Sequence, residues 1–200
     1  MKPTNKPMKR LSLYLFLILF TLQTPSLADD ISDFQIEGMS VGDSALDYFS
    51  EKELKKMKST SDRTKKKTYM RYCFDSKVYK NKVCFYITKN DKSYIIKSIS
   101  GHIKFPNDIA GCYKLQNEVD SEIKEIFTNS MRNERTYKHS GDKSGKTKEK
   151  DIIYKIKSGA EAGTACIDYG KEYGTKYNLP DSFQVFLDSK EYAKYLKTAW

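Results

Sequence analysis

Residues 83–105 read VCFYITKNDKSYIIKSISGHIKF, and this stretch is the strongest indication of the fold class. From Val83 to Ile87, apolar side chains occupy every second position, which is the period of a half-buried β-strand. The polar segment KNDK, residues 89–92, is typical of a turn, and residues 93–105 again carry apolar side chains on one face. The stretch therefore predicts an antiparallel hairpin.

A long helix is predicted directly after this hairpin. Pro106 ends the second strand, and Asn107 is a suitable N-cap for a helix that runs to about Phe127. Its apolar residues are related by spacings of three and four, with Ile126 and Phe127 both one turn after Ile123, and form a single stripe: Ile109, Cys112, Leu115, Val119, Ile123, Ile126 and Phe127. We expect this stripe to pack on the sheet.

The remaining chain combines further strands with short helices. Asp43 or Ser44 is a suitable N-cap for one short helix, and the S-x-x-E box that begins at Ser50 predicts a second. Further strands are predicted over residues 68–74, 152–157, 164–169 and 183–187. Ser189 is suitable as the cap of a C-terminal helix, whereas residues 129–150 are almost devoid of apolar side chains and are expected to form a flexible basic loop.

These elements predict the fold class. We expect an α+β domain with an antiparallel sheet, two short N-terminal helices, one long central helix packed on the sheet and a C-terminal helix.

The first 28 residues have the pattern of a secretory signal peptide. Four basic residues precede an apolar run over residues 11–22, and Ser26 and Ala28 are small residues before a cleavage site. The alternative is a transmembrane anchor, but twelve helical residues rise only about 18 Å against a bilayer core of about 30 Å. No cysteine lies near the cleavage site to carry a lipid. We expect a signal peptide over 1–28 and a single soluble domain over 29–200, periplasmic or secreted.

The charge balance is mildly basic. The chain has 36 Lys and Arg against 26 Asp and Glu, and loss of the leader lowers the basic excess to six. This excess is not typical of a dedicated nucleic-acid binder. Much of it lies in residues 52–71 and 138–150, which form either a solvated surface or a surface that attracts anionic lipids, cell-wall polymers or polynucleotides.

All four cysteines follow the predicted leader. In an oxidising compartment an even number of cysteines indicates disulfides, for which three connectivities exist. Cys73 and Cys84 flank a turn-rich segment between two strands, so we expect them to pair, which leaves Cys112 to pair with Cys166. The alternative is buried free thiols. The chain has no C-x-x-C pair, which argues against disulfide-exchange chemistry.

Two motifs resemble catalytic sequences but lack essential parts. Residues 141–147, GDKSGKT, resemble a phosphate-binding P-loop with three residues between the glycines instead of four. The GDS sequence ending at Ser44 resembles the nucleophile motif of small exported esterases, but no histidine follows His139, and neither His102 nor His139 has an aspartate three residues earlier. A serine without such a base is not activated at neutral pH, so we interpret Ser44 as a helix cap.

No metal or cofactor site is expected. A catalytic zinc needs three protein ligands, and the two histidines have no partners at suitable spacing. Glu118, Glu122 and Glu125 on the long predicted helix are either paired carboxylates of a hydrolase or a solvated helix face.

One segment also carries a family resemblance. Residues 36–48, IEGMSVGDSALDY, resemble a segment near the start of small exported proteins of marine bacteria, and residues 96–103 and 109–112 fit the same pattern. No activity is assigned to that family, so the resemblance implies export and transfers no site residue. A looser similarity is to envelope-assembly lipoproteins, whose mature N-terminal cysteine this chain lacks.

We therefore expect a non-catalytic envelope module that binds an unknown macromolecular partner, without a small-molecule cofactor. The alternatives are a binder of anionic polymers or membrane surfaces through the basic stretches, and a hydrolase without a recognisable motif.

Overall fold

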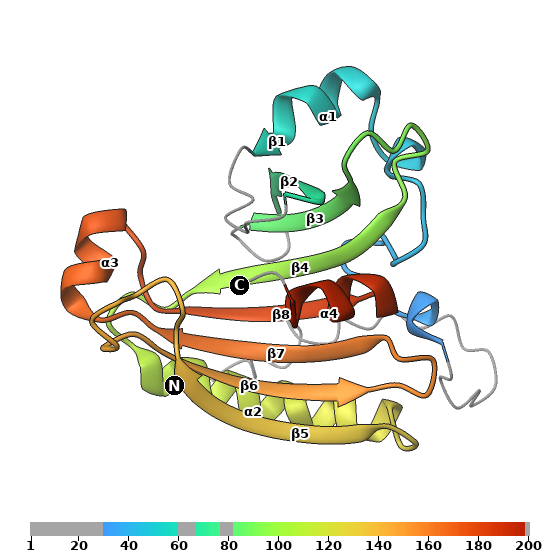
Figure 1. Ribbon diagram of the computed structural model, residues 1–200. Helices are drawn as coiled ribbons and strands as arrows, with labels where there is room; N and C mark the ends of the chain where they lie inside the picture. Colours follow the sequence, from blue (N-terminus) through green and yellow to red (C-terminus); the bar gives the residue numbers. More distant parts are fainter. Residues whose placement is uncertain (1–29, 60–66, 77–81, 199–200) are drawn as a thin grey trace, which may run out of the picture.

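The computed structural model describes residues 30–59, 67–76 and 82–198 (Figure 1). The predicted signal peptide lies outside these residues, as does most of the connector that follows the second predicted helix. Among the described residues, no helix is long and apolar enough to cross a lipid bilayer.

Within the described residues, eight strands form one sheet in which all neighbouring strands are antiparallel. Their order across the sheet is β1-β2-β3-β4-β8-β7-β6-β5. The bounds are β1 (Lys58–Ser59), β2 (Tyr69–Asp75), β3 (Lys82–Thr88), β4 (Ile96–Lys104), β5 (Met131–Lys138), β6 (Lys148–Lys155), β7 (Glu161–Asp168) and β8 (Ser182–Asp188). The predicted hairpin is confirmed as β3 and β4, and the α+β class with an antiparallel sheet is confirmed as well.

The long helix α2 (Ile109–Ile126) packs on one face of the sheet, mainly against β7 (Figure 1). We call this face the α2 face. Its apolar stripe is buried at Cys112, Leu115 and Val119, as the spacing predicted. The N-cap is Asp108, one residue after the predicted one, and its carboxylate accepts a hydrogen bond from the Gly111 amide at 2.9 Å.

The C-terminal helix α4 (Lys190–Leu196) lies on the opposite face, over β4 and β8, and we call this the α4 face (Figure 1). Ser189 caps it, as predicted. The Tyr192 ring contacts the rings of Tyr69 and Tyr86, so α4 also reaches the outer strands β2 and β3.

The N-terminal segment, residues 30–57, runs from the end of α2, where the Phe34 ring contacts the Phe127 ring, to the strands β2 and β4. Ser44 caps a single 3-10 turn, η4 (Ala45–Asp47), where a helix was predicted, and the capping box at Ser50 starts α1 (Glu51–Met57), as predicted. Another 3-10 turn, η3 (Ile31–Asp33), precedes them. Gly42 adopts φ +100°, a left-handed conformation that favours glycine, and its amide donates to the Ile96 carbonyl at 2.9 Å.

The prediction of a loop over residues 129–150 is wrong. Residues 131–138 form β5, and β6 begins at Lys148, so only a short connection of nine residues separates the two strands. Every residue of β5 is exposed, which is why its composition resembles that of a loop. β5 is held by backbone pairing to β6 and by ion pairs such as Arg132 to Asp120 at 2.8 Å. The helix α3 (Lys171–Tyr177), between β7 and β8, was not predicted.

Both predicted disulfides are present. Cys73 and Cys84 are directly opposite each other on β2 and β3, and Cys112 of α2 is joined to Cys166 of β7. No free cysteine occurs among the described residues, which excludes the alternative of buried thiols. Two disulfides in one small domain are typical of proteins that fold in an oxidising compartment.

Candidate functional site

Two carboxylates lie side by side on the α4 face of β6. Lys150 and Tyr154 point to the α2 face, because the Lys150 amine lies over the Tyr113 ring and the Tyr154 hydroxyl bonds to Asp120. Since side chains alternate along a strand, Glu149 and Asp151 point to the opposite face, about 7 Å apart along the backbone. We call these two residues the acidic pair.

The adjacent edge strand β5 supplies the partners of this pair. Arg135 is directly opposite Asp151 and Tyr137 is opposite Glu149. The Asp151 Oδ2 atom accepts hydrogen bonds from Arg135 Nη2 at 3.1 Å, from Arg135 Nε at 3.3 Å and from the Tyr137 hydroxyl at 2.9 Å. The guanidinium also lies 5.0 Å from the centre of the Tyr137 ring, which fixes both side chains over the carboxylate.

The other oxygen of Asp151 has no such partner. Asp151 is only 4% exposed, and its Oδ1 atom accepts no hydrogen bond from an N–H or hydroxyl group of the described residues, although the Glu149 carboxyl is close enough to share a side-chain hydrogen bond with Asp151. Buried carboxylate oxygens are normally paired, because removal from water without compensation is costly. This oxygen can therefore accept either the proton of a neighbouring carboxylic acid or the N–H group of a ligand.

Burial and mutual repulsion change the titration of the pair. Burial raises the pKa of the Glu149 carboxyl, and the negative charge of Asp151 adds to this effect, so that the pKa reaches about 7. Burial also raises the pKa of Asp151, against the hydrogen bonds from Tyr137 and Arg135 that lower it. Arg135 provides one positive charge for the two carboxylates of the acidic pair. Near neutral pH the remaining negative charge is balanced by a proton on the pair, or by a bound cation.

The pH dependence of stability tests this titration. Because the pKa of Glu149 is higher in the folded chain than its usual value of 4.5, the folded protein holds a proton that the unfolded chain releases, and stability falls as the pH rises from about 4.5 to 7. Glu149→Gln removes the titrating group, so we expect it to raise the free energy of unfolding by about 1–3 kcal/mol at pH 8 and by much less at pH 4. Urea unfolding at the two pH values measures this difference.

A matched control is Glu118→Gln, on the exposed surface of α2. It should leave the pH profile of stability close to that of the wild type. A Glu149→Gln protein that gained as much stability at pH 4 as at pH 8 would show that the effect comes from packing and not from titration.

A group of aromatic side chains lies at the same end of the sheet as the acidic pair. The connection 139–147 folds against α3. Lys146 pairs there with Glu172 at 3.2 Å, and the Thr147 hydroxyl oxygen accepts a hydrogen bond from the Gly170 amide. The rings of His139, Tyr169, Tyr173 and Tyr177 form a chain of contacts there. Since Tyr137 and Glu149 adjoin the two ends of this connection, the aromatic group lies at the same end of the sheet as the pair.

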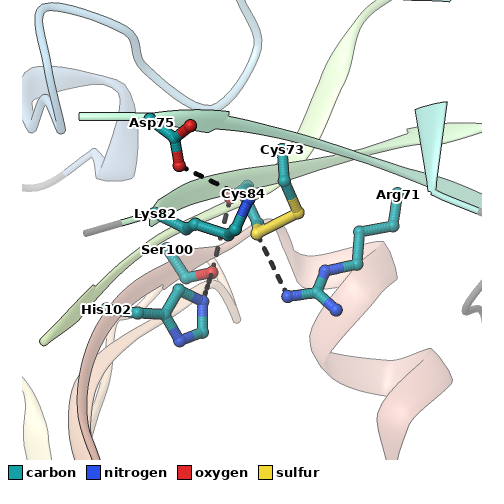
Figure 2. Close-up of a disulfide and its surroundings, with 7 residues drawn as sticks. All are labelled: Arg71, Cys73, Asp75, Lys82, Cys84, Ser100 and His102. Atoms are coloured by element: carbon teal, nitrogen blue, oxygen red, sulfur yellow. Dashed lines mark hydrogen bonds and ion pairs between the residues drawn. A yellow bond between two sulfur atoms is a disulfide. The ribbon is translucent and has the colours of Figure 1, made fainter. Parts of the chain in front are cut away.

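A second polar group lies on the α4 face at β2–β4. His102 is on the opposite face from the strand's isoleucines, and its Nε2 atom is 3.0 Å from the Ser100 hydroxyl (Figure 2). Burial, together with the nearby Arg71 charge, lowers the pKa of His102 to about 4. The ring is therefore neutral at physiological pH, but Ser100 is only 2% exposed and offers no accessible nucleophile.

The motifs that resembled catalytic sequences have structural roles. The P-loop-like segment joins two strands instead of a strand and a helix, and its Asp142 carboxylate accepts hydrogen bonds from Ser144 and Thr147. Ser44 caps η4 and donates to the Ser93 carbonyl at 2.7 Å. No group of three or more potential metal ligands occurs within the described ranges.

The other candidate residues do not gather into a site. Glu118 and Glu125 are exposed on α2, whereas Glu122 is half-buried and borders a small apolar cavity of about 60 Å³. Burial, with the neighbouring charges of Glu118 and Glu125, raises the pKa of Glu122. The basic stretch 52–71 is described only in part. In the stretch 138–150, Lys146 and Lys150 are paired with Glu172 and Glu134.

Comparisons with known proteins identify no family: no family model, curated protein or solved structure matches this chain.

The acidic pair was missed by sequence reasoning because residues 129–150 were interpreted as a loop. The pattern that could have revealed it is the alternation of lysine and acid over residues 148–151, KEKD, which places opposite charges on opposite faces of a strand.

Proposed function

We propose that this chain is an exported envelope module that binds a cationic side chain of a partner protein at the acidic pair of β6. The observation that carries the proposal is the Asp151 Oδ1 atom, which is buried, accepts no hydrogen bond from an N–H or hydroxyl group of the described residues, and has only the carboxyl of Glu149 as a neighbour to share a hydrogen bond with Asp151. An ammonium or guanidinium group supplies both the missing donor and the missing positive charge.

Access to the pair is through Glu149. Asp151 lies beneath Arg135 and Tyr137, whereas Glu149 keeps part of its surface exposed. A cation entering beside Glu149 replaces the proton that the pair holds near neutral pH.

Export is the second part of the proposal. Residues 1–28 serve as a signal peptide, and the two disulfides support this because such bonds persist in oxidising compartments. The mass of the protein isolated from its native cells tests it. A product lacking residues 1–28 is expected, and an intact Met1 would contradict export by cleavage.

Binding is tested by titration calorimetry with three probes: a short lysine-rich peptide, spermidine as a free polyamine, and polyphosphate as an anionic polymer. We expect the peptide to bind the wild type, more tightly at pH 8 than at pH 6 because the cation must displace a proton. Asp151→Asn should weaken this binding at least tenfold, since it removes a charged acceptor.

The matched control is Asp75→Asn, a surface carboxylate on β2 that pairs with Lys82. It should bind the peptide like the wild type. Binding of spermidine alone would identify a free amine as the ligand instead of a protein. Salt-sensitive binding of polyphosphate, unaffected by Asp151→Asn and without peptide binding, would favour the basic stretches, and turnover of an ester or glycan abolished by Glu149→Gln would favour a hydrolase.

A further inference from the structure

The two disulfides lie in different surroundings. Cys112 and Cys166 are both fully buried between α2 and β7. Cys73 and Cys84 join two neighbouring strands on the α4 face, where Cys84 is fully buried but Cys73 remains partly exposed. Cys73 is therefore the one of these four cysteines that keeps part of its surface exposed to an external thiol.

A guanidinium group lies against the buried sulfur of the exposed bridge. Arg71 is two residues before Cys73 on β2, so both side chains point to the α4 face. The Arg71 Nη2 atom lies 3.1 Å from Cys84 Sγ and points toward it (Figure 2). The nearby Lys82 is instead paired with Asp75 at 3.4 Å, which makes Arg71 the cation that contacts the sulfur in this view (Figure 2).

This contact favours one direction of bond cleavage. Burial by itself raises the pKa of a thiol, whereas a guanidinium beside the sulfur stabilises the thiolate. In thiol–disulfide exchange, the bond breaks faster when the departing sulfur leaves as a stabilised thiolate. At this bridge, accessibility selects Cys73 as the sulfur that is attacked, and Arg71 selects Cys84 as the sulfur that leaves.

We propose that Cys73–Cys84 is a thiol-exchange site, at which an external thiol forms a mixed disulfide on Cys73. The thiolate of the incoming thiol attacks Cys73 Sγ and forms a new S–S bond. The electron pair of the Cys73–Cys84 bond leaves with Cys84 Sγ, which becomes a thiolate beside Arg71. A second thiolate can then release Cys73, so that two thiols are oxidised to one disulfide and the bridge is reduced.

The absence of a C-x-x-C pair argued against exchange chemistry, and this proposal differs from that expectation. The two cysteines are eleven residues apart in the chain, yet the register of β2 and β3 places them opposite each other. The arginine contact likewise depends on pairing between strands and not on spacing along the sequence.

The test exposes the folded protein to glutathione, and separately to a dithiol oxidoreductase such as a thioredoxin, in the absence of denaturant. The mixture is quenched with acid, free thiols are alkylated with N-ethylmaleimide, and the peptides are mapped by mass spectrometry. We expect the glutathione adduct on Cys73, the alkyl group on Cys84, and an intact Cys112–Cys166 bridge. Faster reduction by the oxidoreductase would identify a protein thiol as the preferred reactant, and faster adduct formation with glutathione would identify a small thiol.

Substitutions then test the role of Arg71. Arg71→Met should slow adduct formation on Cys73 by about tenfold, because the leaving thiolate loses its cation. Lys82→Met is the matched control, since it removes a nearby charge that does not contact the sulfur, and it should react within about twofold of the wild type. Arg71→Lys should recover part of the lost rate.

An adduct on Cys84, equal reactivity of both bridges, or no reaction before unfolding would each overturn the proposal. So would an Arg71→Met protein that reacts as fast as the wild type. If Arg71→Met does not fold, the position of the adduct in the wild type decides, because only attack at Cys73 agrees with the mechanism.

Discussion

Replacing Cys112 and Cys166 together by alanine is expected to lower the free energy of unfolding by about 4 kcal/mol. This bridge closes a span of 54 residues and joins α2 to β7 in the core, so its loss releases much chain entropy in the unfolded state. Urea denaturation of the double variant and of the wild type, followed by circular dichroism, measures the difference.

The second bridge provides the comparison. Cys73 and Cys84 close a span of only 11 residues, so the matched double alanine variant should lose about 3 kcal/mol. A larger loss for this pair than for Cys112 and Cys166 would show that contacts in the folded state, and not loop closure, dominate the contribution of these disulfides.

Phe85→Ala is expected to destabilise the protein by about 3–5 kcal/mol. The Phe85 ring is fully buried on the α2 face of β3, with the Tyr72 ring stacked against it at 5.5 Å and the Phe49 ring at 6.0 Å. Truncation leaves a cavity between these rings and removes two aromatic contacts. Thermal unfolding by calorimetry provides the measurement.

The control for Phe85 is a substitution that fills most of the space. Phe85→Leu should cost clearly less than Phe85→Ala, because the cavity is smaller. Equal losses for the two variants would indicate that ring stacking with Phe49 and Tyr72, and not the filled volume, holds this part of the core.

The elements predicted with the right type are those whose signal is local. The alternation in β3 reports one buried face, and the stripe of α2 reports a helix that covers a sheet, because burial of apolar surface is the main gain in folding. The capping serines at positions 50 and 189 satisfy backbone amides of their own helices, so their role is also readable from a few neighbouring residues.

The strand β5 shows why the rest was not predictable. Its eight residues are all exposed and bury no apolar face, so no periodic signal distinguishes them from a loop. They form a strand because β6 offers backbone hydrogen bonds and because Arg132 and Arg135 find carboxylates on α2 and β6. These partners are distant in sequence and become neighbours only in the folded chain.

Local patterning was sufficient to predict the fold class, the long helix, the hairpin and the bridge between Cys73 and Cys84 on neighbouring strands, and pairing these two left Cys166 as the partner of Cys112. The charge of the candidate site, in contrast, depends on how the strands pair in the folded chain. Residues 138–150 are basic in composition, but pairing as a strand turns Lys148 and Lys150 to the α2 face and Glu149, with Asp151, to the α4 face. The physical reason is that even-numbered and odd-numbered residues of this strand point to opposite faces of the sheet. The two faces differ in their surroundings only after the neighbouring strands and the covering helix are in place.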